Sequence, residues 1–200
     1  MNKKYNLNRI KILKAARNIV ARQGIQNSTL QVIAEAAGMS KGSLYYYYRS
    51  KDDILYDIME QDNVESMKMV DRLNKESCDH IKVISDIISA TMERIKNIEK
   101  NSINVHLQGE ALRGNDGLMK KYRSKYSEWI QNVEKVISTI HDVEPCPLTK
   151  TYAALFLAAV DGLCMQQLLL DEILADEELL KTLGFMLLNF RFDADTPGMR

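Results

Sequence analysis

The spacing of hydrophobic residues along the 200-residue chain predicts helices throughout. Apolar side chains recur every three or four residues over 12–20, and no convincing stretch shows the period of two that strands require. Gly24 is placed to end this first helix, and Thr29 is placed to cap the second. Ser40 would cap a short third helix that ends near Tyr47. The pattern predicts an all-α fold.

Six longer helices are predicted for the rest of the chain. Ser50 is a suitable N-cap, followed by Asp52 and Asp53 in a first turn, where the helix dipole favours carboxylates. Segments rich in glycine or proline, at 114–117 and 145–147, separate later helices. The predicted spans, which bring the total to about nine helices, are about 51–74, 79–98, 102–113, 117–142, 148–171 and 176–191.

Basic and acidic residues are distributed unevenly, although the formal net charge is zero. Residues 1–51 contain ten Lys or Arg and a single acid, Glu35, so this segment carries +9 and the remainder −9. A basic segment joined to an acidic body is typical of a polyanion-binding module attached to a second domain. The alternative is a solvated helix surface that is basic by chance.

The basic segment also has the pattern of a helix-turn-helix over residues 29–47. Ala34 and Ala37 are small where the two helices would cross, and Gly38 permits the positive φ that ends the first of them. The second helix presents cationic, hydroxyl and aromatic groups with almost no acid, so it could enter a DNA major groove. The tyrosine run at 45–48 could instead stack the bases of a single strand.

Residues 28–55, STLQVIAEAAGMSKGSLYYYYRSKDDIL, resemble the signature of TetR-family transcriptional regulators, and the similarity spans about residues 8–58. The family more often has Phe where this chain has Tyr48, which is expected to pack inward. Tyr46 is expected to pack on the first helix or to face solvent. The resemblance implies that DNA is contacted by Thr29, Gln31, Lys41, Gly42, Ser43, Tyr45, Tyr47 and Lys51.

The same resemblance implies a division of the chain. We expect a DNA-binding domain at 1–50, a connecting helix at 51–74, a ligand-binding and dimerisation domain at 75–193, and a tail at 194–200. Within the third part, the residues that loosely resemble the BetI-like subgroup of C-terminal domains are 106–112, Tyr122, Tyr126, Trp129 and 159–163.

The last two helices are the most apolar parts of the chain, and a terminal helix that is hydrophobic around much of its circumference requires a partner. A homodimer would place two recognition helices about one DNA turn apart and would bind a pseudo-palindromic operator. The expected interface residues are Leu155, Leu163, Leu179, Leu183, Met186, Leu187 and Phe190.

The family resemblance also implies a small-molecule effector, hydrophobic or amphipathic, that releases a repressor from DNA. A pocket for it would be mostly apolar with a few polar anchors. The candidate lining residues are Met92, Ile95, His106, Glu110, Met119, Tyr122, Tyr126, Trp129 and Phe156. Each also has a structural interpretation: His106 as a surface histidine, Glu110 as an ion-pair partner, and the aromatic residues as a core stripe.

Other classes of protein find less support. Glu99 or Glu110 with His106, and Cys146 with His141, are conceivable catalytic pairs, but no catalytic, phosphate-binding or metal-ligand motif accompanies them. We therefore expect no enzyme activity, no cofactor and no metal. A purely structural dimer would not explain the basic segment. Three cysteines without a C-x-x-C pair, and the lack of a signal or membrane segment, indicate a soluble cytoplasmic protein.

Overall fold

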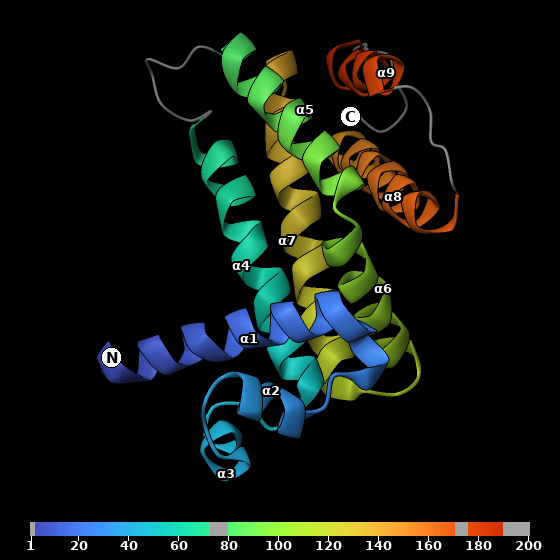
Figure 1. Ribbon diagram of the computed structural model, residues 1–200. Coiled ribbons are helices and arrows are strands. Elements are labelled where there is room, and N and C mark those ends of the chain that lie inside the picture. Colours follow the sequence, from blue (N-terminus) through green and yellow to red (C-terminus); the bar gives the residue numbers. More distant parts are fainter. Residues whose placement is uncertain (1–2, 73–79, 171–175, 190–200) are drawn as a thin grey trace. The chain divides into compact units, whose positions relative to one another are not determined.

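The computed structural model describes residues 3–72, 80–170 and 176–189, which contain nine helices and no strand (Figure 1). The all-α prediction is confirmed. The chain forms two compact units, 1–63 and 64–200, and α4 (Lys51–Arg72) runs through the boundary between them. The division expected at 50, 74 and 193 stays a prediction, because 74, 193 and the tail at 194–200 lie outside the described residues.

The smaller unit contains α1 (Lys3–Asn27), α2 (Leu30–Ala36), α3 (Lys41–Tyr45) and the beginning of α4. Gly24 interrupts α1 with φ 77° and ψ 166°, as its position in the sequence predicts. The core of the unit is aliphatic. Its most deeply buried side chains are Ile12, Leu13, Ala16, Ile33, Ala34, Leu44, Ile54, Leu55 and Ile58.

Side-chain caps fix where the short helices begin. The Thr29 hydroxyl accepts a hydrogen bond from the backbone N–H of Val32, and Ser40 does the same for Ser43. Gly38, with φ 68°, ends α2 in a conformation that side chains disfavour. The predicted helix-turn-helix is therefore present and locally encoded.

The start of α4 is capped as the sequence predicts. Ser50 Oγ accepts from the backbone N–H of Asp53 at 3.1 Å and donates to Asp53 Oδ2 at 2.8 Å. The first bond satisfies a backbone N–H that a helix N-terminus otherwise leaves open, and the second orients the Ser50 hydroxyl. They fix α4 directly after the segment that follows α3.

The larger unit contains α5 (His80–Lys96), α6 (Ile98–Leu112), α7 (Asp116–His141), α8 (Pro147–Leu169) and α9 (Asp176–Leu188). α6 begins earlier than the predicted residue 102 because Asn97 caps it through the N–H of Lys100, at 2.9 Å. α8 packs on α5, α6 and α7, and α9 packs on α5 and α7. The core residues are Met92, Ile95, Ile137, Tyr152, Ala153, Phe156, Val160, Cys164, Leu179, Leu183 and Leu187.

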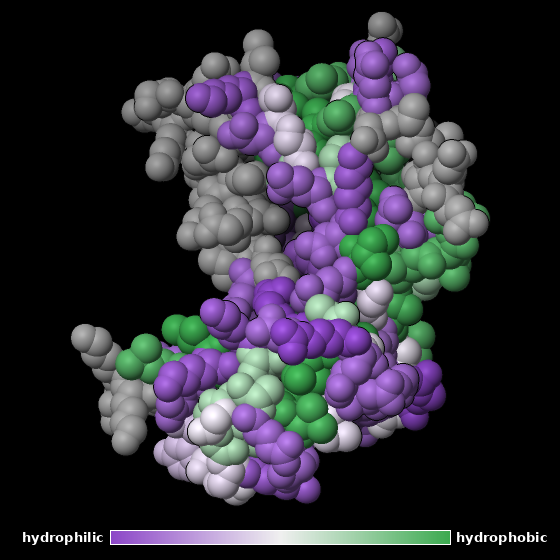
Figure 2. Space-filling view, in the orientation of Figure 1, coloured by the Kyte–Doolittle hydropathy of each residue, from purple (hydrophilic) through white to green (hydrophobic). Residues whose placement is uncertain are grey.

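α8 is long and apolar enough to cross a membrane by length and composition alone, which is weak evidence for a span. One side of the helix is buried in the core of its own unit, through residues that include Tyr152, Phe156 and Val160. Leu155 and Leu169 are exposed on it, at 62% and 73%. Hydrophobic residues reach the molecular surface near this helix (Figure 2). α8 is thus a core helix with a second apolar surface.

Candidate nucleic-acid interface

All eight residues predicted to contact DNA lie in the smaller unit, on α2, on α3 and its flanks, and at the first residue of α4. Six of them are exposed: Thr29, Gln31, Lys41, Gly42, Ser43 and Tyr45. Tyr47 and Lys51 are half-buried. The short α3 buries Leu44, so its remaining residues are available to a ligand. The helix therefore presents cationic and hydroxyl groups outward, as the sequence predicts.

Aromatic rings continue this surface beyond α3. The Lys41 ammonium lies 5.9 Å from the centroid of the Tyr45 ring, within range of a cation–π interaction. Tyr46 is 77% exposed and packs edge-to-face with Tyr47 at 5.3 Å between centroids. Of the two positions expected for Tyr46, it takes the solvent-facing one.

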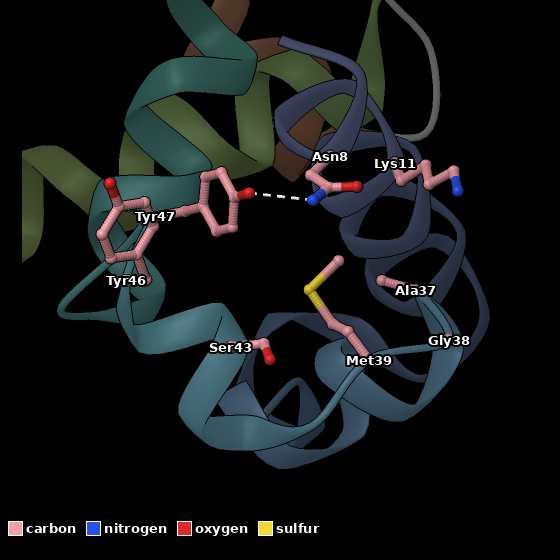
Figure 3. Close-up of a pocket in the computed structure, with 8 residues that line it drawn as sticks. All are labelled: Asn8, Lys11, Ala37, Gly38, Met39, Ser43, Tyr46 and Tyr47. Carbon is pink, nitrogen blue, oxygen red and sulfur yellow. Dashed lines mark hydrogen bonds between the residues drawn. The ribbon is translucent and has the colours of Figure 1, made fainter. Parts of the chain in front are cut away.

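A depression of about 450 Å³ lies between α1, the turn after α2, and the residues around α3. Asn8 Nδ2 donates to the Tyr47 hydroxyl at 2.8 Å, and the Met39 side chain points inward from the turn (Figure 3). Met39 is half-buried. The lining residues are Asn8, Lys11, Ala37, Gly38, Met39, Ser43, Tyr46 and Tyr47.

Asn8 and Lys11 are the polar residues of this depression that the sequence analysis did not single out. They lie three residues apart on α1, a spacing that places two side chains on one side of a helix. That spacing is common in any helix, so only the fold reveals that it faces Tyr47. α1 therefore adds an amide and an ammonium to the surface formed by α3.

A buried tyrosine connects three segments of the smaller unit through hydrogen bonds. Tyr48 is 5% exposed, as expected for a residue that packs inward, and its hydroxyl donates to Asp57 Oδ2 at 2.6 Å. Arg9 Nε donates to the same carboxylate at 3.0 Å and to the Tyr48 hydroxyl at 3.1 Å. Burial, followed by the bond to Asp57, raises the pKa of Tyr48. The three side chains join α1, the segment after α3, and α4.

Two of the predicted DNA contacts have partners within the unit. Lys51 Nζ donates to the backbone carbonyl of Ile25 at 2.9 Å, beside the break at Gly24. Gln31 Nε2 donates to Glu35 Oε1 at 2.5 Å. In this structure Lys51 therefore stabilises the segment that leads into α2.

The residues predicted to bind an effector all lie in the larger unit, but several are core residues there. Met92, Ile95 and Phe156 belong to its hydrophobic core, and Tyr122 is also buried. Glu110 forms an ion pair with Arg113, in line with its structural interpretation. The half-buried candidates are His106, Glu110, Met119, Tyr126 and Trp129.

The residues predicted to contact a partner copy are also divided. Leu179, Leu183 and Leu187 are at most 5% exposed and pack in the core of their own unit, so these three side chains are not available to a partner. The sequence pattern misassigned them because α9 is apolar on more than one side. Leu163 and Met186 are partly buried against the same core, Leu155 is exposed, and Phe190 lies outside the described residues.

Comparisons with known proteins agree with this geometry. The family described as "Bacterial regulatory proteins, tetR family" matches residues 12–58. The chain is 24% identical over 172 residues to the uncharacterized HTH-type transcriptional regulator YfiR of Bacillus subtilis, covering 82% of each chain.

Solved structures share the fold over nearly the full length. A transcriptional regulator from Saccharomonospora viridis, in complex with choline, has a TM-score of 0.69 at 21% identity and covers 90% of this chain and 96% of its own. SmeT, the repressor of the Stenotrophomonas maltophilia multidrug efflux pump SmeDEF, has a TM-score of 0.65 at 18% identity, with 90% and 88% covered. The BetI-like resemblance of the C-terminal part stays a prediction. Residues 12–58, which contain the helix-turn-helix, match the TetR family of bacterial regulatory proteins, as the sequence resemblance predicted.

Proposed function

We propose that the chain is a sequence-specific, ligand-responsive repressor of transcription that binds a pseudo-palindromic operator as a homodimer. The observation that carries this proposal is the exposed side of α3, where Lys41, Ser43 and Tyr45 stand together without an acidic residue on that helix. A helix of this kind can read base edges while its lysine and hydroxyls contact phosphates.

We assign the DNA contacts by position within the unit. Lys41, Gly42 and Ser43, at the N-terminal end of α3, meet base edges, and Tyr45 and Tyr47 donate to phosphates. Thr29 and Gln31 contact the backbone from the start of α2. Lys51 contacts a phosphate after its hydrogen bond to the Ile25 carbonyl is broken. Its contribution to DNA affinity therefore depends on the exchange of that carbonyl for a phosphate.

Asn8 and Lys11 extend the phosphate-binding surface from α3 onto α1. Asn8 Nδ2 donates to the Tyr47 hydroxyl and so orients it on this surface. Lys11 is exposed at the rim of the same depression and adds a positive charge. A DNA strand that follows this surface would meet two additional polar side chains.

A second copy of the chain is the proposed partner of α8 and α9. Both helices keep apolar side chains exposed after their own core is formed, and such surfaces mark interaction sites. A twofold dimer would join two such helix pairs into a four-helix interface. The exposed residues that support it are Leu155, Met165, Leu169, Phe185 and Leu188.

We propose that a small hydrophobic or amphipathic effector binds residues 75–193 and lowers operator affinity through the connecting helix at 51–74. Two similar structures, the repressor SmeT and the regulator in complex with choline, support repression and ligand binding. A coupling free energy of about 1–3 kcal/mol would weaken operator binding about 5–150-fold. The relatives named above are regulators rather than enzymes, and we propose the same for this chain, acting in the cytoplasm.

Selection of bound sequences from a random duplex pool at near-physiological salt tests the proposal. Recovery of an inverted repeat is expected, and binding to it should weaken steeply as salt is raised. Recovery of no sequence above background would contradict a sequence-specific regulator. Recovery of a single half-site would contradict the twofold dimer.

A further inference from the structure

Four helices of the larger unit contribute to one polar and aromatic cluster. The Arg94 guanidinium of α5 pairs with Asp161 Oδ1 of α8 at 2.5 Å, and the Tyr126 hydroxyl of α7 donates to Asp161 Oδ2 at 2.8 Å. Gln108 of α6 donates to the Tyr126 hydroxyl at 2.9 Å. The guanidinium carbon of Arg94 lies 5.7 Å from the centroid of the Trp129 ring. We refer to these five residues as the Asp161 cluster.

The cluster holds its arginine with the groups that bind organic cations. One partner of the guanidinium is a carboxylate, and the other is the face of an indole. Tyr126 lies edge-to-face with Trp129 at 5.2 Å between centroids, which adds a second aromatic ring. Aromatic rings are the usual environment of bound quaternary ammonium groups, and here a carboxylate lies beside them.

The cluster is only partly buried, so solvent and solutes can reach it. The side chains of Arg94 and Asp161 are 26% and 19% exposed, and Tyr126 and Trp129 are half-buried. Arg94 lies in the last turn of α5, and its long side chain can extend into water while its helix stays in place. The guanidinium can therefore leave the cluster without unfolding the unit.

We infer that the Asp161 cluster is the binding site of a hydrophobic organic monocation, and that the Arg94 guanidinium occupies the site in the ligand-free chain. The role of this cation as the effector rests on the regulator function proposed above. Binding exchanges one cation for another: Arg94 moves into solvent, and the ligand takes its place beside Asp161 and Trp129.

The balance of charge favours a monocation over other ligands. A neutral ligand that displaced Arg94 would leave the half-buried Asp161 carboxylate without its cation, which is costly. An anion would face that carboxylate and the electron-rich ring of Trp129. Arg94, Asp161 and Lys100 all act electrostatically on the Cys164 thiol, so Lys100 lies near the ion pair. Exchange of Arg94 for a monocation leaves the total charge near Lys100 unchanged.

The sequence contains one tryptophan, so its fluorescence reports on this cluster directly. The full-length protein is titrated with tetraphenylphosphonium and, separately, with tetraphenylborate, which has nearly the same size and apolar surface but the opposite charge. Saturable quenching by the phosphonium and none by the borate is expected. Equal responses to the two ions would overturn the inference, because apolar contact alone would then explain binding.

Three variants separate the cluster from general electrostatics. Arg94→Met removes the internal competitor and should strengthen phosphonium binding on the order of tenfold, whereas Asp161→Asn should weaken it by a similar factor. Glu128→Gln is the matched control, because Glu128 is adjacent to Trp129 in sequence but pairs with Lys125. Weaker binding by Arg94→Met, or equal loss by Glu128→Gln and Asp161→Asn, would contradict the exchange.

A final measurement distinguishes this inference from the regulator function. Operator affinity is first measured without any added cation, so that a failure of sequence-specific binding is recognised separately. The phosphonium is then expected to lower operator affinity in the unmodified chain and to have little effect in Asp161→Asn. Phosphonium that binds beside Trp129 but leaves operator affinity unchanged would overturn its role as an effector.

Discussion

Each unit of the molecule contains an aspartate that binds both an arginine and a tyrosine hydroxyl. In the smaller unit these are Asp57, Arg9 and Tyr48, and in the larger unit Asp161, Arg94 and Tyr126. Both arginine–aspartate distances are 2.5 Å. The two groups therefore share their chemistry, and what differs is the surrounding structure.

The difference lies in the aromatic rings. Tyr48 is 5% exposed and packs in the core of its unit, while the side chains of its partners Arg9 and Asp57 are 39% and 21% exposed, so the contrast lies in the rings and not in the ion pairs. Tyr126 is half-buried and lies against Trp129, which is itself partly accessible. The same three functional groups thus connect helices in the smaller unit and, in the larger unit, form part of a site that a ligand can enter.

Removal of the two aspartates tests this contrast most strongly. Asp57→Ala removes the carboxylate that accepts from the Arg9 guanidinium and from the buried Tyr48 hydroxyl, and leaves only the bond from Arg9 Nε to that hydroxyl. The substitution should lower the free energy of unfolding by about 2 kcal/mol, less than for a fully buried pair because Arg9 is partly solvated. Asp161→Ala should cost a similar amount. Urea denaturation, followed by circular dichroism, measures both.

Operator binding separates the two variants even where their stabilities agree. Operator binding is measured without urea, at a temperature where both variants are folded. Asp57→Ala is expected to bind the operator more weakly, because Arg9 and Tyr48 no longer hold α1 and the segment after α3 to α4. Asp161→Ala is expected to keep ligand-free operator affinity. A loss of operator affinity in Asp161→Ala but not in Asp57→Ala would contradict the roles given to the two aspartates.

The sequence predicted most accurately those features that depend on neighbouring residues. Gly24, Thr29 and Ser50 act within one helical turn, so breaks and caps could be located without knowledge of the fold. The match in pattern at 28–55 identified the exposed residues of α3 for the same reason. Asn97 was missed as a cap, and α6 begins earlier in consequence.

Features made by distant residues were not predictable in this way. Arg94 and Asp161 are 67 positions apart, so nothing in the local sequence of either one indicates the other. Tyr126 and Trp129 were predicted as lining residues, but their polar partners were not. α9 is apolar on two sides, and only packing shows that Leu183 faces its own core while Phe185 remains exposed.

Changes on the outer surface of the smaller unit should alter DNA binding without any change at Trp129. Lys41→Ala and Ser43→Ala are expected to change sequence preference, at a cost of about 1–3 kcal/mol for the preferred base pair. Lys51→Met should instead weaken binding to all sequences and lower the salt dependence. Competition assays with operator variants measure the preference, and salt titrations measure the slope.

The ligand response provides the control for these variants. Each should retain the phosphonium quenching of the unmodified chain, since its altered residue belongs to the smaller unit. Lys51→Met also removes the bond to Ile25, so its unfolding curve is measured in parallel. A preference change in Lys51→Met equal to that in Lys41→Ala would show that Lys51 reads sequence rather than charge.

Removal of the two tyrosine hydroxyls is a finer comparison. Tyr48→Phe and Tyr126→Phe each delete a hydrogen bond to an aspartate that keeps its arginine, so each should cost about 1 kcal/mol of unfolding free energy. Tyr126→Phe alone should change the phosphonium affinity. Calorimetry gives the stabilities, and fluorescence titration gives the affinities.

The pH dependence of stability checks the same two hydroxyls. Burial raises the pKa of both tyrosines in the folded chain, so the unfolded chain loses these protons first as pH rises. Stability is therefore retained below pH of about 10, the ordinary tyrosine value, and falls above it. Each Phe variant should show a shallower fall than the unmodified chain. Identical slopes would mean that neither hydroxyl is held in its neutral form.

Asn8→Ala is expected to have the smallest effect, because it acts on DNA through another side chain. The substitution removes the donor that orients the Tyr47 hydroxyl and should lower operator affinity by about 0.5–1 kcal/mol. In Tyr47→Phe the hydroxyl is already absent, so adding Asn8→Ala should cause little further loss. Additive losses in the double variant would instead assign Asn8 a DNA contact of its own.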